Sequence, residues 1–318
     1  MTPLPRRPLG RSGLSVVPFA LGGNVFGWTV EEATGFRILD AFVSAGFNLI
    51  DTADTYSIWI PGHHGGESET LIGRWLNETG RRGDVLLATK VGMDMGPGGK
   101  GLSAEHIARS ADASLHRLQT DYIDLYQAHE DDQETSLDET MEAFGELVED
   151  GKVRALGASN YGADRLEEAL RCSAERGLPR FESLQPRYNL MDRTDFEGKL
   201  ESVCRTHGLG VLAYAALASG FLTGKYRSRA DLGKSPRGAR AESRLTDRGM
   251  RILKALDDVG SRLGAAPATV ALAWLISRPA ITAPIASATS LDQLGELLRA
   301  ASLKLDADSA RQLDQASA

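Results

Sequence analysis

The feature that most constrains this chain is the regular alternation of short apolar runs with amphipathic segments. Parallel strands buried on both faces read as continuous apolar runs, whereas the helices between them carry apolar residues on one face only. The eight expected strands are VVPFALGG (16–23), FNLIDTA (47–53), DVLLATKVG (84–92), YIDLYQAH (122–129), VRALGAS (153–159), FESLQP (181–186), GVLAYAAL (210–217) and ITAPIASA (281–288). Eight strands separated by helices, without a linker or low-complexity break, predict a single α/β domain over residues 1–318, a (β/α)8 TIM barrel.

Local start signals support the helices between these strands. Thr29 stands where a cap belongs for a helix over residues 30–45, and Glu32, three residues on, would complete a capping box. Ser103 and Ser136 are candidate caps of two later helices.

Composition narrows the class of protein. The net charge of −7 argues against nucleic-acid binding, which needs an excess of Lys and Arg. Cys172 and Cys204 fall in helical segments and form no disulfide framework, so we interpret them as small buried side chains. The basic N-terminus is not followed by an apolar stretch, and no run reaches membrane-spanning length. We therefore expect a cytoplasmic protein that binds neither membranes nor nucleic acid, and no segment specifies a protein partner.

Polar side chains follow four of the apolar runs. NLIDTADTY (48–56) supplies Asp51 and Tyr56, LLATKVG (86–92) supplies Lys90, and LYQAHE (125–130) supplies His129. The carboxyl ends of barrel strands meet at one rim, which is where such barrels place their chemistry. A carboxylate, a phenol, an amine and an imidazole on one rim predict a proton-transfer site.

These four groups suit the reduction of a carbonyl, which needs a proton at oxygen while hydride reaches carbon. A free phenol has a pKa near about 10 and donates well only when its acidity is tuned. We expect the Lys90 ammonium to lower the pKa of Tyr56 and Asp51 to keep that ammonium charged. His129, as a neutral imidazole, would orient the carbonyl oxygen. Each residue alone also has an ordinary structural interpretation as a cap, a surface charge, a packed aromatic or a core histidine.

The same residues resemble the catalytic Asp, Tyr, Lys and His of the aldo-keto reductases. The likeness extends through LGRSGLSV (9–16), an opening hairpin in that family, GASN (157–160), SLQPRYNL (183–190) and LASGFLTGKY (217–226). The resemblance implies NAD(P)H-dependent reduction of aldehydes or ketones to alcohols, or the reverse oxidation, with Tyr56 as the acid and without metal. It also implies a small-molecule carbonyl or alcohol as the partner.

The resemblance further implies a cofactor site. Ser159, Asn160 and Gln185 match the groups that bind the nicotinamide carboxamide, and Tyr214 matches the aromatic that stacks on its ring. The full set of implied cofactor contacts is Gly22, Gly23, Asn24, Asp51, Ser159, Asn160, Gln185, Tyr214, Ala215, Leu217, Ser219, Gly220, Leu222, Lys225, Ser287, Ser290 and Gln293.

The chain also departs from the family pattern. Ala215 and Ala216 replace the usual Ser-Pro after the stacking Tyr, which puts the shape of that loop in doubt. Glu130 and Asp131 follow the His where Arg or Trp and then Pro are common, and their charge would disfavour acidic substrates.

The segment PIASATSLDQLGEL (284–297) bears on cofactor choice, because it places Ser287, Ser290 and Gln293 where family members often have cations. We therefore expect NADPH as the default cofactor, with measurable NADH use and weak discrimination. The irregular stretch 224–244 could restore selectivity or be a solvated loop. Its basic residues include Lys225, Arg227, Arg229, Lys234, Arg237 and Arg240.

The substrate pocket is less defined. Phe26, Trp28 and Trp59 follow barrel strands and would form apolar walls beside Tyr56 and His129, or simply pack at the rim. The chain ends soon after its last helical segments, without the long tail that closes the pocket of steroid-reducing relatives. We expect an open site for small or medium carbonyls.

Two other functions remain as alternatives. One is a nicotinamide-nucleotide-binding regulatory subunit with little turnover, and the other is a cofactor-free barrel isomerase. GPGGKG (96–101) fits a dinucleotide motif but lacks its context, and we interpret it as a flexible loop. His63 and His64 lie near Glu67 and Glu69 without convincing metal-ligand spacing, so no metal site is predicted.

Overall fold

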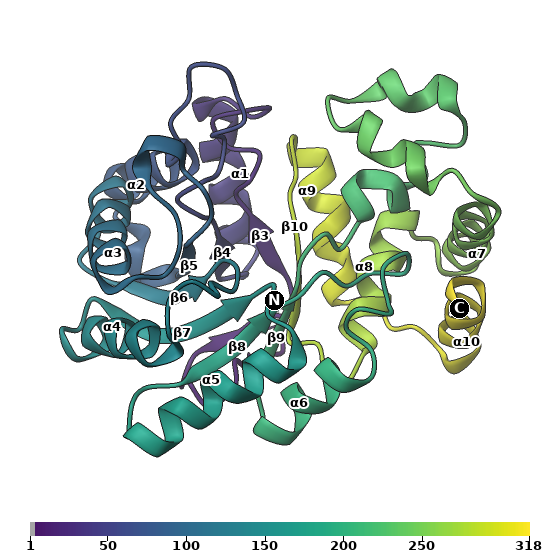
Figure 1. The fold of residues 1–318 in the computed structure, drawn as a ribbon. Helices are drawn as coiled ribbons and strands as arrows, with labels where there is room; N and C mark the ends of the chain where they lie inside the picture. The colour runs from purple at the N-terminus through teal and green to yellow at the C-terminus, as the bar shows by residue number, and fades with distance from the viewer. Residues whose placement is uncertain (1–3) are drawn as a thin grey trace.

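The protein is described over residues 4–318 by a computed structural model, which shows eight parallel strands closed into a barrel (Figure 1). Each strand pairs with the next along the chain, and the last pairs with the first. In barrel order the strands are β3 (Ala20–Gly22), β4 (Leu49–Asp51), β5 (Leu86–Val91), β6 (Ile123–Ala128), β7 (Val153–Ser159), β8 (Phe181–Gln185), β9 (Gly210–Ala213) and β10 (Ala283–Ala286). The TIM barrel expected from the alternating pattern is confirmed.

The first expected strand is divided between two elements. Residues 15 and 16 belong to an antiparallel hairpin of β1 (Arg7–Pro8) and β2 (Ser15–Val16), which confirms the predicted opening hairpin. Pro18 then interrupts the run, because proline has no N–H to donate to a strand ladder. The barrel strand therefore begins only at Ala20. The hairpin packs Leu9 and Leu14 against apolar residues inside the barrel, so it covers the end opposite to the strand carboxyl ends.

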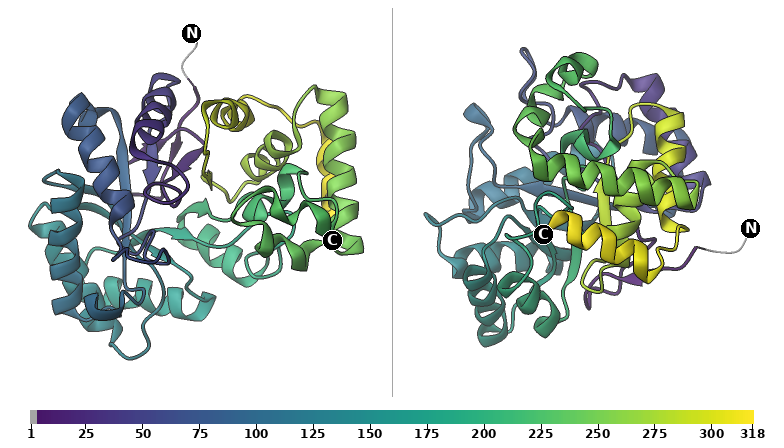
Figure 2. Two further views of the ribbon diagram at one scale, coloured as in Figure 1. Left: turned by 90° about the horizontal axis from the view of Figure 1, so that it is seen from above. Right: turned by 90° about the vertical axis from the view of Figure 1, so that its right-hand side faces the viewer.

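Ten α-helices occur among residues 4–318. They are α1 (Glu32–Ser44), α2 (Glu67–Thr79), α3 (Ala104–Leu118), α4 (Leu137–Glu149), α5 (Ala163–Arg176), α6 (Lys199–His207), α7 (Asp247–Leu263), α8 (Pro267–Ser277), α9 (Leu291–Leu298) and α10 (Ala307–Ser317). Helices cover the outside of the barrel, and α7 and α10 pack on each other (Figure 2). No single helix within residues 4–318 is long and apolar enough to cross a membrane, although α7 and α8, bent by 93° at their junction, pass that test together by length and composition.

Two of the three predicted helix caps are confirmed. The side chains of Ser103 and Ser136 accept hydrogen bonds from backbone N–H groups in the first turns of α3 and α4. The prediction for Thr29 was wrong, because α1 begins at Glu32 with Glu31 as its cap. The N–H groups of residues 28–30 all bond the carbonyl of Val25, so Thr29 belongs to a tight turn before the helix.

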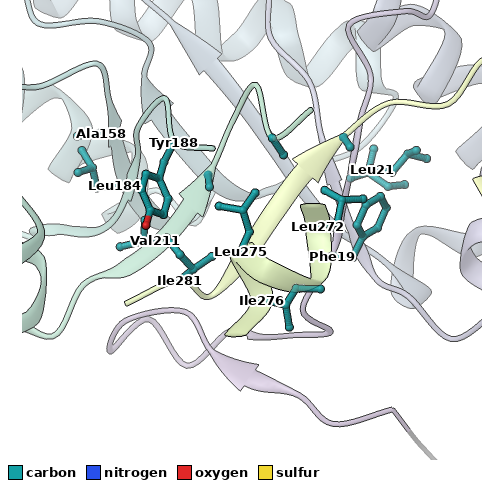
Figure 3. Packing of buried hydrophobic residues seen from close by; sticks show 14 of the residues in the cluster. Phe19, Leu21, Ala158, Leu184, Tyr188, Val211, Leu272, Leu275, Ile276 and Ile281 are labelled. Carbon is teal, nitrogen blue, oxygen red and sulfur yellow. The ribbon is translucent and has the colours of Figure 1, made fainter. Parts of the chain in front are cut away.

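The main core lies between the barrel wall and the helices. Figure 3 shows Leu272 and Leu275 of α8 between Phe19 on one side and Val211 and Tyr188 on the other. All of these side chains are fully or almost fully buried. This packing fixes the strands that carry the polar residues described below.

The stretch after β9 is folded, but not as α-helix or strand. It forms short 3₁₀ helices η3 (Ala218–Thr223), η4 (Arg229–Lys234) and η5 (Gly238–Arg244). Ser228 and Asp231 form a capping box at η4. Runs this short give no apolar period, which explains why the sequence of 224–244 reads as irregular. Other 3₁₀ turns are η1 (Arg81–Asp84), η2 (Gly96–Gly98) and η6 (Arg299–Ala301).

Candidate active site

Neighbouring strand ends bring Asp51, Tyr56, Lys90 and His129 together at one end of the barrel. Asp51 is the last residue of β4, Lys90 lies near the end of β5, and His129 directly follows β6. Tyr56 lies in the turn after β4. The juxtaposition predicted from four separate segments is therefore present in the structure.

The ammonium of Lys90 is fully engaged. It donates to Asp51 Oδ2 at 2.8 Å, to the carbonyl oxygen of Thr52 at 2.7 Å and to the Tyr56 hydroxyl oxygen at 2.9 Å. An ammonium has three N–H donors, so each has one partner. Because Lys90 donates to the Tyr56 oxygen, the Tyr56 proton remains available to another acceptor. Asp51 Oδ2, at 3.4 Å, is a long alternative partner for it.

The pKa of Tyr56 differs from the expectation. Burial raises it, Lys90 lowers it by a smaller amount, and Asp51 raises it further, so the pKa stands at about 12. The expected lowering by Lys90 is present, but burial outweighs it. Tyr56 is therefore protonated at neutral pH. Burial alone would lower the pKa of Lys90, yet Asp51 and Tyr56 together raise it, which keeps the ammonium charged.

His129 is held as a neutral imidazole. Burial, with the Lys90 charge as a second cause, keeps its pKa well below the ordinary value. Its ring lies 6.1 Å from the Tyr56 ring, at 71° to it. Nδ1 is buried and has no hydrogen-bond partner within residues 4–318. A neutral imidazole beside a phenol can donate one hydrogen bond to an oxygen placed between them.

A cavity of about 880 Å³ opens beside Tyr56 and His129. Most of the predicted cofactor and substrate residues line it. Those that do are Gly22, Asn24, Asp51, Tyr56, Trp59, His129, Ser159, Asn160, Gln185, Tyr214, Ala215, Leu217, Ser219, Gly220, Lys225, Ser287 and Gln293. The cavity therefore joins the four rim residues to the loop after β9 and to the segment after β10.

Ser159, Asn160 and Gln185 have used all their side-chain donors. Gln185 Nε2 donates to Asp51 Oδ1 at 2.9 Å and to Gln127 Oε1 at 3.1 Å. Asn160 Nδ2 donates to the His129 carbonyl oxygen at 2.9 Å, and Ser159 Oγ donates to the Gln185 carbonyl oxygen at 3.0 Å. Carboxylate and carbonyl oxygens only accept, so these bonds fix how both amides are oriented. The side-chain oxygens at this end of the cavity can still accept hydrogen bonds, which suits a ligand N–H₂ group.

The loop after β9 approaches the cavity with an unusual backbone. Ala215, Ala218 and Ser219 have φ of 53°, 49° and 58°, and Gly220 follows at 90°. The hydroxyl of Tyr214 donates to Asn160 Oδ1 at 2.7 Å, which ties the start of this loop to the end of β7. Ala215 and Ala216, which replace the Ser-Pro common in the family, lie in this loop, and both line the cavity.

At the other end, Gly22 and Ser287 approach closely. A Cβ added at Gly22 would lie 2.9 Å from Ser287 Oγ, and Ser287 donates to Asn24 Oδ1. Gln293 accepts from the Thr289 hydroxyl at 3.0 Å. Ser290 caps α9 through the N–H of Gln293 and is not part of the lining.

Three cations from residues 224–244, called the 3₁₀ segment below, line the cavity: Lys225, Arg237 and Arg240. Burial, with Arg240 as a second cause, lowers the pKa of Arg237. Neither arginine forms an ion pair within residues 4–318, whereas Arg227 pairs with Asp257 at 2.7 Å. Arg229 and Lys234 likewise pair, with Glu242 and Asp231. The segment thus presents part of its positive charge to the cavity.

Some predicted site residues lie elsewhere. Phe26 is fully buried in the core, and Leu222 is a fully buried residue of η3. Gly23 faces Ser68 and donates its N–H to the Asp51 carbonyl oxygen. Trp28 packs against Trp59, with ring centroids 5.6 Å apart. The Arg237 guanidinium lies 6.0 Å from the Trp28 ring centroid. Of the expected aromatic walls, only Trp59 faces the cavity directly.

Sequence reasoning missed several lining residues, namely Thr55, Met93, Asp94, Arg187, Ala268, Ile285, Ala286 and Glu296. Arg187 follows β8, and its guanidinium lies 5.7 Å from the Tyr214 ring centroid. Its place directly after a barrel strand was an available signal, since every strand carboxyl end contributes to this rim. Met93 and Asp94 follow β5 in the same way.

The match to known proteins agrees with this geometry. The family model described as "Aldo/keto reductase family" matches residues 18–318. The chain belongs to the aldo/keto reductase family. It is 38% identical over 315 residues to "Uncharacterized oxidoreductase YrpG" of Bacillus subtilis (strain 168), covering 96% of this chain and 94% of that protein.

Two other relatives carry different descriptions. One is "L-glyceraldehyde 3-phosphate reductase" of Escherichia coli O157:H7, 31% identical over 97% of this chain and 91% of that protein. Another is "Probable voltage-gated potassium channel subunit beta" of Oryza sativa subsp. japonica, 33% identical over 92% of this chain and 89% of that protein. This aldo/keto reductase thus resembles both oxidoreductases and a protein named as a channel subunit.

The remaining motifs lie away from the four rim residues. Within residues 4–318, no group of three or more His, Cys, Asp or Glu side chains is placed to hold a metal ion. His63 Nδ1 lies 3.9 Å from Glu67 Oε1, on a surface turn. The glycine-rich stretch 96–101 contains η2 and leads into α3, and none of its residues lines the cavity.

Proposed function

We propose that this protein reduces aldehyde or ketone carbonyls to alcohols with a nicotinamide cofactor, and catalyses the reverse oxidation. The observation that carries the proposal is the contact of the Lys90 ammonium with both the Tyr56 oxygen and the Asp51 carboxylate, beside a neutral His129. A protonated phenol next to a neutral imidazole supplies a proton donor and a second hydrogen bond for one carbonyl oxygen.

The residues present fit a nicotinamide dinucleotide. The acceptors of Gln185 and Asn160 suit a carboxamide N–H₂ group, and the positive φ values after Ala215 leave room for backbone to approach phosphates. Lys225, Arg237 and Arg240 supply positive charge for those phosphates. Ser287, Gln293 and Glu296 would lie at the adenosine end.

When bound, the cofactor supplies the hydride that adds to the carbonyl carbon. Tyr56 gives its proton to the carbonyl oxygen, so the C=O becomes CH–OH. The tyrosinate left behind is stabilised by the Lys90 ammonium until solvent returns the proton. His129 donates to the same oxygen and fixes its position against Tyr56. In the oxidation direction the tyrosinate removes the alcohol proton.

Cofactor choice is carried by the cations of the 3₁₀ segment. We propose NADPH as the preferred cofactor with measurable use of NADH, because residues 284–297 contain no Lys or Arg to pair with a 2′-phosphate. A hydrogen bond to a charged group is worth about 1.5–3 kcal/mol against about 1 for a neutral bond. Arg237 and Arg240, which line the cavity, would therefore maintain some preference for NADPH over NADH.

The substrate end of the cavity is negatively charged and partly aromatic. Glu130 and Asp94 line it together with Trp59 and Met93. We propose that small or medium neutral carbonyls enter here more readily than anionic ones. No residue after Leu297 lines the cavity within the described chain, which supports an open site.

The experiment that tests the proposed function is a carbonyl screen with NADPH and NADH, using neutral, anionic and steroid substrates. We expect turnover of small neutral aldehydes with both cofactors. Negligible turnover across the panel, with a stable complex recovered from cells, would instead support the regulatory subunit suggested by the channel-subunit relatives. Absence of any nicotinamide-nucleotide binding, measured by Trp fluorescence, would support the cofactor-free isomerase.

A further inference from the structure

A buried polar cluster lies on the outer side of the barrel wall, behind the rim residues. It consists of Glu69 in α2, Thr89 in β5 and Arg117 in α3. Glu69 is fully buried. Its Oε1 accepts from the Thr89 hydroxyl at 2.5 Å, and its Oε2 accepts from Arg117 Nε at 2.7 Å. None of these groups lines the cavity or takes part in the proton transfer described above.

Thr89 and Lys90 are consecutive residues of one strand. Successive side chains of a strand point to opposite faces, so Thr89 faces the helices while Lys90 faces the barrel interior. The bond from Thr89 to Glu69 therefore holds, from outside, the strand segment that presents Lys90 to Tyr56. The main chain of Lys90 is also held, because its carbonyl oxygen accepts from the N–H of Asp54 at 3.3 Å.

The first turn of α2 also holds Thr52, whose carbonyl oxygen accepts a hydrogen bond from the Lys90 ammonium. The Thr52 hydroxyl donates to Ser68 Oγ at 2.8 Å, and Ser68 donates to the carbonyl oxygen of Gly23 at 2.8 Å. Thr52 is the residue whose carbonyl oxygen accepts from Lys90. Residues 68 and 69 thus fix three strand ends at once, those of β3, β4 and β5.

Stability alone is a poor reason for this arrangement. A buried ion pair generally contributes little beyond what a well-packed apolar group of similar size would, since both charges must be desolvated. An ion pair can, however, fix the orientation of its carboxylate. Here Arg117 holds the Glu69 carboxylate so that it accepts from Thr89, the strand residue next to Lys90.

We propose that Glu69, anchored by Arg117 and acting through Thr89, is a positioning residue for Lys90 in the proton-transfer step. This inference rests on the proposed function. Without the Thr89 contact, the end of β5 gains freedom and the distance from Lys90 to the Tyr56 oxygen is no longer fixed. A misplacement of about 1 Å at such a site can cost about a hundredfold in rate.

The test compares Thr89→Val with Thr140→Val in the full-length protein. Thr140 is almost fully buried, its hydroxyl donates to the Leu102 carbonyl oxygen at 3.1 Å, and neither residue lines the cavity. The two variants therefore each lose one buried threonine hydroxyl. Thr89→Ser keeps the hydroxyl and serves as the rescue variant. For each variant, NADPH affinity, kcat in both directions, the pH profile of alcohol oxidation and urea unfolding are measured.

We expect Thr89→Val to lower kcat by about tenfold or more with little change in NADPH affinity. The rise of its oxidation rate with pH should move to higher pH, because a displaced ammonium lowers the pKa of Tyr56 less. Thr89→Ser should restore both, and Thr140→Val should lose stability without either change. The inference is overturned if Thr89→Val and Thr140→Val differ only in stability. Should Thr89→Val fail to fold, an unaltered pH profile in Glu69→Gln would overturn it instead. An unmodified protein without turnover would contradict the proposed function, not the positioning role.

Discussion

The ammonium nitrogen of Lys90 lies 2.9 Å from the hydroxyl oxygen of Tyr56 and 4.7 Å from the centroid of its ring. Lys90 therefore approaches Tyr56 at its oxygen, and Lys90 is fully buried whereas Tyr56 lies at the cavity wall. A cation in this position stabilises the tyrosinate more than the phenol. The contact consequently matters most when Tyr56 carries a negative charge, that is, after it has given up its proton.

Lys90→Met should show this asymmetry. Replacing the ammonium leaves the Asp51 carboxylate buried without a cation, which should cost about 3–5 kcal/mol of unfolding free energy. The kcat for alcohol oxidation, which needs the tyrosinate, should fall further than the kcat for carbonyl reduction at the same pH. Lys152→Met is the control, because Lys152 pairs with Asp112 at an exposed site and such pairs contribute at most about 1 kcal/mol. Equal losses in both directions would contradict the role assigned to Lys90.

The pH dependence of reduction follows from two shifted groups. The pKa of Tyr56 is raised to about 12, and the pKa of His129 is held well below its ordinary value of 6.5. Both groups therefore keep their working forms, protonated phenol and neutral imidazole, as pH passes through 6.5. We expect kcat/KM for reduction to show no inflection there. An inflection near 6.5 that disappears in His129→Gln would show that His129 titrates in the working range.

Asp54 should make the stability of the protein fall with rising pH. Burial, with Glu69 as a second cause, raises the pKa of Asp54 to about 8, whereas an unfolded Asp titrates near about 3.9. Between these values the folded state binds the extra proton, so its contribution is complete below the unfolded pKa and is lost as pH rises to 8. The slope from this group is at most about 1.4 kcal/mol per pH unit.

Asp54→Asn removes the titration while keeping the shape of the side chain. Urea unfolding at several pH values from 5 to 8 should show the variant gaining stability relative to the parent as pH rises. Asp84→Asn is a suitable control, because Asp84 is exposed and pairs with Arg81 at the surface. A constant difference between Asp54→Asn and the parent at all pH values would show that Asp54 does not hold a proton.

Arg237→Met should weaken NADPH use selectively. Its guanidinium lines the cavity and forms no ion pair within residues 4–318, so a phosphate is its natural partner. Losing one charge-assisted bond of about 1.5–3 kcal/mol should lower kcat/KM for NADPH by about tenfold or more. The value for NADH should change much less. Arg229→Met, at an exposed arginine paired with Glu242, is the matched control.

The parent preference is informative by itself. A preference for NADPH above about a thousandfold would show that cations outside 284–297 select the cofactor, and that the lack of Lys and Arg in this segment does not set it. Equal effects of Arg237→Met on the two cofactors would exclude a role of Arg237 at the 2′-phosphate.

The sequence predicted the barrel and the meeting of Asp51, Tyr56, Lys90 and His129 because strand ends share one rim by topology. It could not give the pKa of Tyr56, since the balance between burial and the Lys90 charge depends on how completely the ring is covered. Thr29 was misassigned because a turn and a helix cap begin with the same residue type.

Other features depend on contacts that no local pattern records. Phe26 faces the core rather than the cavity, which only the path of the turn after β3 determines. The bond from Thr89 to Glu69 joins a strand to a helix on its outer face, and each residue alone reads as an ordinary polar side chain. The 3₁₀ segment reads as irregular although three of its cations turn inward.

The most direct test of the central claim is the rate of carbonyl reduction by Tyr56→Phe. The substitution removes the proton donor and little volume, so NADPH binding, followed by quenching of Trp fluorescence, should persist. Reduction, followed by loss of the absorbance of reduced nicotinamide, should fall by several orders of magnitude. Turnover close to that of the parent, with the cofactor bound, would contradict the assignment of Tyr56 as the acid.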